Sequence, residues 1–69
     1  MKRLTHEREA RGWTRMDLGF HARIHPSRIG SIELARVVPY PVELKRIAEA
    51  LAWDGDAEAL LEEVDDDQS

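Results

Sequence analysis

Sixty-nine residues are enough for one small domain with a modest core, and the absence of cysteine excludes disulfides and thiolate metal sites. The three histidines do not share a metal-ligand spacing, and no apolar run approaches the roughly 20 residues of a membrane span. With no secretory signal pattern either, the composition predicts a cytoplasmic protein without membrane attachment, metal or cofactor.

The net charge of −4 is distributed unevenly along the chain. Residues 1–53 contain all 10 lysines and arginines with only 6 acidic residues, whereas residues 54–69 contain the other 8 acidic residues and no base. A basic body can bind the phosphates of nucleic acid, while an acidic segment repels DNA or contacts a basic partner. The overall charge therefore does not exclude nucleic acid as a partner.

The first predicted helix covers residues 2–11 and ends at Gly12, a residue suited to the left-handed conformation that closes many helices. Its apolar face is thin and consists of Leu4 and Ala10. Trp13, just past the helix, can cover the remaining gap.

Two short helices separated by a tight turn come next, over residues 15–22 and 26–34. Thr14 can accept a backbone amide as the N-cap of the first helix. Pro26 suits the first position of the second helix because its ring fixes φ and it has no amide to leave unpaired. His25 precedes it in the cap position.

A small residue, Gly19, stands in the middle of the first of these two helices. Helices that cross steeply need a small side chain where their backbones approach, as in a helix-turn-helix. The apolar anchors of this stretch face one core, and they are Leu18, Ala22, Ile24, Ile29 and Ile32.

The chain resembles the lambda-repressor and Cro type helix-turn-helix family in the order of its motif residues, Leu18-Gly19, Ile24, Ile29, Ile32-Glu33 and then Pro39. The resemblance implies a compact all-α domain of five helices that binds double-stranded DNA, usually as a homodimer. The second helix of the motif is then expected to enter the major groove.

The remaining predicted helices complete this fold. One helix covers residues 41–52, and its core stripe at helical spacing consists of Val42, Leu44, Ile47, Ala48 and Leu51. A last helix begins after a cap at Asp54 or Asp56 and extends through Val64.

The outward face of the second motif helix has the composition of a DNA-reading surface, with Ser27, Arg28 and Ser31 beside Gly30. Small residues permit close approach, and hydroxyls and a guanidinium can reach base edges. An ordinary solvated face, which is the alternative, would carry more Glu and Lys. In the docking mode of the family the base-reading residues are Pro26, Ser27, Arg28 and Ser31. Arg28 is the best candidate for a two-pronged contact with guanine.

The resemblance also implies contacts with DNA phosphates. These are expected from Arg15, Arg23, Arg36 and Tyr40. Arg23 stands in the turn where many family members have glycine, and Ala35 stands where many end the third helix with glycine. If these positions need φ above zero, each costs about 1 kcal/mol relative to glycine.

Arg8 in the first helix and Glu33 in the third match a further feature of the family, an ion pair that clamps the two helices together. The alternative is that both charges are solvated. If the pair is buried, removing one partner costs more than the pair itself contributes, because the other charge is left stranded.

These observations predict a sequence-specific DNA-binding transcriptional regulator, such as a small phage or plasmid repressor, a Cro-like protein or an antitoxin-type regulator. An enzyme is not expected, because a chain of this size has little room for a catalytic pocket.

The alternative is a protein-interaction module on the same fold that binds a partner such as RNA polymerase or a toxin. Met16 and Phe20 share a helix face. They either pack on Trp53 or the chain end, or form an apolar patch for a partner. We expect residues 1–64 to form the domain and the acidic residues 65–69 to form a disordered tail, which is another candidate for partner contacts.

Overall fold

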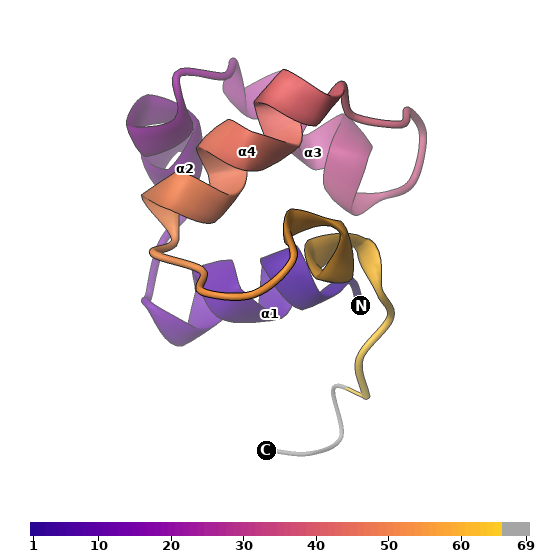
Figure 1. The fold of residues 1–69 in the computed structure, drawn as a ribbon. Helices are drawn as coiled ribbons and strands as arrows, with labels where there is room; N and C mark the ends of the chain where they lie inside the picture. The colour runs from indigo at the N-terminus through magenta and orange to yellow at the C-terminus, as the bar shows by residue number, and fades with distance from the viewer. Residues whose placement is uncertain (66–69) are drawn as a thin grey trace.

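The computed structural model describes residues 1–65, and this part of the chain is helical, with no strand longer than one isolated bridge. Its elements are α1 (Arg3–Ala10), α2 (Arg15–Ala22), α3 (Pro26–Glu33), α4 (Pro41–Ala50) and the short 3-10 helix η1 (Ala57–Leu61) (Figure 1). None of the helices among these residues has the length and apolar character needed to cross a membrane. Apart from Asp65, the expected acidic tail lies outside the described residues.

The expected fifth α-helix over residues 56–64 is replaced by η1. Asp56 caps η1, with its Oδ1 atom 3.0 Å from the Glu58 amide. The chain then becomes extended and pairs with the amino terminus, where the Arg3 amide donates to the Glu62 carbonyl at 2.8 Å. The Val64 amide likewise donates to the Met1 carbonyl at 2.8 Å, so the two ends of the described chain lie side by side (Figure 1). This pairing takes the backbone groups that a longer helix would have used.

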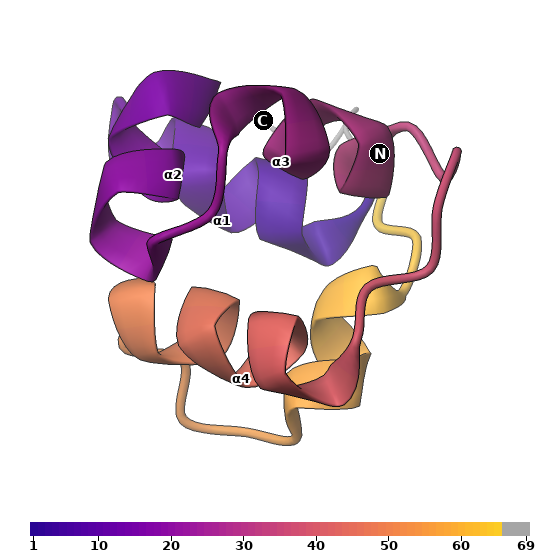
Figure 2. The same ribbon diagram turned by 90° about the horizontal axis from the view of Figure 1, so that it is seen from above.

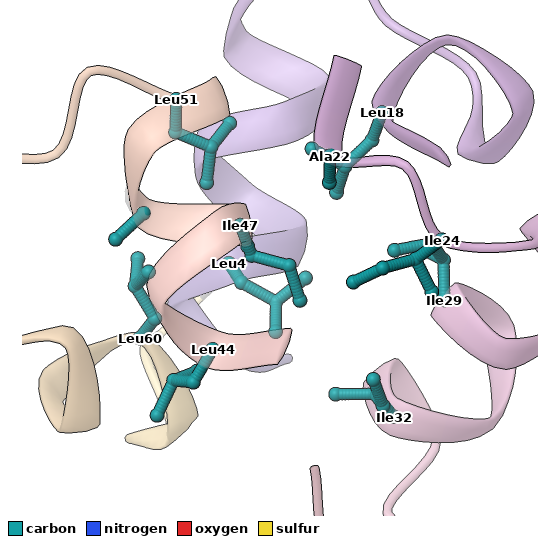
Figure 3. Packing of buried hydrophobic residues seen from close by; sticks show 11 residues of the cluster. Leu4, Leu18, Ala22, Ile24, Ile29, Ile32, Leu44, Ile47, Leu51 and Leu60 are labelled. Carbon is teal, nitrogen blue, oxygen red and sulfur yellow. The ribbon is translucent and has the colours of Figure 1, made fainter. Parts of the chain in front are cut away.

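The core lies between the four α-helices and η1 (Figure 3). Its buried apolar residues are Leu4, Leu18, Ala22, Ile24, Ile29, Ile32, Leu44, Ile47, Ala48, Leu51 and Leu60. Each fully buried leucine or isoleucine contributes about 1.5–3 kcal/mol to folding. The prediction that Ala10 and Val42 lie in the core is wrong. Ala10 is exposed, and Val42 is 52% exposed in the first turn of α4.

The contact between α2 and the start of α3 depends on Gly19. A Cβ atom at this position would overlap the carbonyl oxygen of Ile24 and lie 3.3 Å from the Pro26 nitrogen. The backbone of α2 therefore meets the turn directly, which fixes the position of α3 relative to α2 (Figure 2).

Each α-helix in residues 1–65 is followed, within two residues, by a residue with positive φ. Gly12 after α1 has φ of 71°, but Arg23, Ala35 and Ala52 after the other three have φ of 60°, 60° and 52°. A non-glycine residue in this region costs about 1 kcal/mol. The turn geometry expected at Arg23 and Ala35 is thus kept without the glycine that favours it.

Candidate nucleic-acid interface

The amino end of α3 is ordered by its cap. The Nδ1 atom of His25 accepts the Ser27 amide at 3.1 Å and lies 2.8 Å from the Ser27 hydroxyl oxygen. Pro26 occupies the first helical position, where no amide is needed. Ser27 is exposed, and Pro26 and Ser31 are partly exposed. Gly30 is buried beneath the Arg15 side chain, so the expectation that it belongs to the outward face is wrong.

Arg28, the expected guanine reader, is bound to a carboxylate that sequence reasoning did not connect with it. Its Nε and Nη2 atoms donate to the two carboxylate oxygens of Glu43 at 3.0 and 2.9 Å. The Cζ atom lies 5.5 Å from the centre of the Tyr40 ring. This hydrogen bonding raises the pKa of Arg28 and holds the pKa of Glu43 below its usual range.

Glu43 also orders the start of α4. Its Oε1 atom accepts the Tyr40 amide at 2.8 Å, so one carboxylate caps α4 and holds Arg28 of α3. A glutamate at the third position of a helix that opens with proline is a sequence signal for such a cap. The pairing with Arg28 has no comparable signal, since the two residues belong to different helices.

At the other end of α3, Glu33 contacts two arginines. Arg8 of α1 donates from Nε to Oε2 at 2.7 Å and from Nη2 to Oε1 at 3.1 Å. The side chains of Arg8 and Glu33 are only 9% and 2% exposed, so they are not solvated charges. The hydrogen bond to Glu33 raises the pKa of Arg8.

Arg15, expected on a phosphate, is the second arginine on Glu33. Its Nε atom donates to Glu33 Oε1 at 3.0 Å. The side chain crosses Gly30, where an added Cβ atom would lie 3.3 Å from Arg15 Nη1. The side chain remains 44% exposed.

The other expected phosphate ligands are exposed. Arg23 follows α2, and Arg36 lies in the loop after α3 with its amide bonded to the Ser31 carbonyl at 2.8 Å. Neither arginine side chain forms an ion pair with another residue in 1–65. The Tyr40 ring is exposed beside Arg28. In chain order, Arg23 precedes α3, Arg36 follows it and Tyr40 precedes α4, and all three are exposed.

Comparison with known protein families identifies the family of this chain. The helix-turn-helix domain family matches residues 2–61, nearly the whole chain. The chain belongs to the helix-turn-helix domain family. This membership confirms the resemblance drawn from the motif residues and indicates a DNA-binding regulator. Searches of curated proteins and of solved structures gave no significant match.

This helix-turn-helix domain also exposes apolar side chains. Met16 and Phe20 on α2 are 69% and 80% exposed, so the first of the two interpretations, that they pack on Trp53 or the chain end, does not hold within residues 1–65. Trp53 instead lies beneath the guanidinium of Arg3, with Cζ 5.8 Å from the ring centre. Helix α2 has no neighbour within residues 1–65 that covers the face carrying Met16 and Phe20.

Proposed function

We propose that this helix-turn-helix domain is a sequence-specific transcriptional regulator that places α3 in the major groove of DNA. The observation that carries the proposal is the outer side of α3, where small and hydroxyl-bearing residues and a held arginine replace the Lys and Glu of an ordinary solvated helix. Pro26, Ser27, Arg28 and Ser31 are the proposed base-reading residues.

Phosphate contacts from both sides of α3 fix its register on the duplex. Arg23 and Arg36 provide guanidiniums that form no ion pair within residues 1–65, and Arg15 and the Tyr40 hydroxyl add further contacts. Such contacts position the protein without carrying sequence information. A small repressor of the Cro-like or antitoxin type fits this size and arrangement.

We propose that the protein binds as a homodimer, because one domain of this size reaches a single half-site. Selection of bound sequences from a random duplex pool tests both parts of the proposal. We expect an enriched palindrome whose half-sites lie about one helical turn apart. A pool that remains random after repeated selection would contradict sequence-specific binding.

A second candidate function is a protein-interaction module. It is favoured by one observation, the exposure of Met16 and Phe20 on α2. The salt dependence of DNA binding separates the two functions. A regulator that neutralises several phosphates loses affinity steeply, with a slope of about −0.9 per phosphate in log K against log salt. An interaction module would show weak DNA binding at every salt concentration.

A further inference from the structure

The strongest unexplained feature of the proposed interface is the Arg28–Glu43 pair. It joins the amino end of α3 to the amino end of α4 through two hydrogen bonds of 3.0 and 2.9 Å. The side chains are 30% and 15% exposed, so the pair is neither buried like Arg8–Glu33 nor fully solvated. A tie between two helices accounts for its presence, but its geometry also bears on recognition.

The hydrogen bonds to Glu43 use one edge of the guanidinium. Arginine has five N–H donors in a fixed plane, and Glu43 takes one from Nε and one from Nη2. The two N–H groups of Nη1 and the second N–H of Nη2 remain. The fork formed by Nη1 and Nη2 matches the N7 and O6 acceptors of guanine. Arg28 can therefore keep Glu43 and contact guanine at the same time.

Because Glu43 holds Arg28, the Arg28 side chain loses less conformational entropy when it binds DNA. A free arginine side chain loses many rotamers when it contacts a base, whereas the Arg28–Glu43 pair has lost them during folding. The Tyr40 ring, whose centre is 5.5 Å from Cζ, further restricts the orientation of the Arg28 guanidinium. The orientation of the fork is set before DNA arrives.

The pair also changes the charge that DNA meets. Glu43 neutralises Arg28, and a phosphate placed beside the pair would be repelled by the carboxylate. The acceptors on base edges carry only partial charges, so the carboxylate repels them much less than it repels a phosphate. The Arg28–Glu43 pair thus favours a base contact over the phosphate contacts that dominate non-specific binding.

We propose that Glu43 is a positioning residue that determines specificity: it directs Arg28 to guanine and weakens binding to non-specific DNA. This inference rests on the proposed function, because it requires α3 to face the major groove. It assigns a role in recognition to a residue of α4 that itself contacts no base.

Three variants separate positioning from charge and from helix capping. Glu43→Gln removes the charge but keeps an acceptor for the Tyr40 amide. Glu43→Asp keeps the charge and a capping carboxylate, but the shorter side chain cannot reach both Nε and Nη2. Asp17→Asn is the matched control, because Asp17 occupies the same third position in α2 and caps the Thr14 amide at 2.8 Å without an arginine partner.

Arg28→Ala first identifies the base pair at which sequence preference depends on Arg28. Binding of the full chain and its variants is then measured to three kinds of DNA: the duplex enriched by selection, the same duplex with each of the other bases at that pair, and random duplex. We expect Glu43→Asp and Glu43→Gln each to reduce the guanine preference about tenfold. Glu43→Gln should also bind random duplex several-fold more tightly at low salt, and Asp17→Asn should keep the guanine preference. Thermal melts establish that each variant is folded.

The inference is overturned if the wild type prefers guanine at this pair and both Glu43 variants prefer it equally. The Arg28–Glu43 pair would then be a tie between α3 and α4 alone. It is also overturned if no base preference depends on Arg28. A wild-type protein without any sequence preference would instead contradict the proposed function, and the inference would fall with it.

Discussion

The two ends of α3 use the same chemistry in different surroundings. At the carboxyl end, Glu33 is almost fully buried and binds Arg8 and Arg15. At the amino end, Arg28 binds Glu43 with 30% of its side chain exposed. One end is closed within the fold, and the other lies open beside the proposed base-reading residues.

The difference in burial decides what each pair can do. A buried pair must stay complete, because a stranded charge inside the protein is very costly. A partly exposed pair contributes less to stability than a buried pair, and the arginine can share its remaining donors with a ligand. The burial at the carboxyl end of α3 indicates a role in folding, and the exposure at its amino end agrees with the DNA contact proposed above.

The largest expected effect is at the carboxyl end. Glu33→Ala should lower the free energy of unfolding by about 3 kcal/mol, because it leaves Arg8 buried without its carboxylate. Denaturant melts of Glu33→Ala, Arg8→Ala and the double variant measure this loss and the coupling between the two sites. Additive losses would show that the side chains do not interact.

At the amino end the expected effect is on DNA. Arg28→Ala should weaken binding to the selected duplex about tenfold and relax the preference at one base pair. Arg36→Ala, the matched control, should weaken all sequences alike and reduce the salt slope by about one unit. Titrations at several salt concentrations measure both. Equal losses on every sequence for the two variants would contradict the division between base reading and phosphate binding.

The end of α3 should also be open to stabilisation without a change in DNA binding. Ala35→Gly is expected to stabilise the fold by about 1 kcal/mol, because Ala35 has φ of 60°. Gly12→Ala, at the corresponding position after α1, should destabilise it by a similar amount, since Gly12 has φ of 71° and an added Cβ meets no atom within 4 Å. Loss of stability in Ala35→Gly would contradict the strain assigned to this residue.

The smallest expected effect is a dependence of stability on pH. Hydrogen bonds from Arg28 hold the pKa of Glu43 below its usual range, and the Thr14 amide lowers the pKa of Asp17. Both carboxyls bind protons more weakly in the folded state, so their stabilisation is complete above the usual carboxyl range and disappears as pH falls through the lowered values. Melting temperatures between about pH 5 and pH 2 should fall less for Glu43→Gln than for the wild type. Parallel profiles would contradict the shift.

Much of the fold could be predicted from local sequence signals. Thr14 and Pro26 mark helix starts, and Gly19 marks the close contact before α3. The prediction of a carboxyl-terminal α-helix through Val64 was wrong, because the apolar spacing of this stretch gives no sign that residues 62–64 pair with the amino terminus. Val42 was placed in the core by helical periodicity, but its position in the first turn of α4 leaves it exposed.

The residues of the proposed site could be predicted from the sequence, but the ion pairs between them could not. The sequence shows that α3 carries Arg28 on its outer side, yet the partner Glu43 lies 15 residues away on another helix. The contact between Arg15 and Glu33 likewise joins two helices, and no local pattern in the sequence predicts it. Contacts between helices depend on their packing, and periodicity within each helix does not specify it.

In the proposed function, the amino end of α3 and its flanking loops face DNA. Backbone amide shifts of the labelled protein, recorded during titration with the selected duplex, test it most directly. We predict the largest changes at the start of α2, over residues 25–31 and over residues 36–40, with little change in α1 and η1. Changes concentrated in α1 and η1, with α3 unaffected, would contradict the claim.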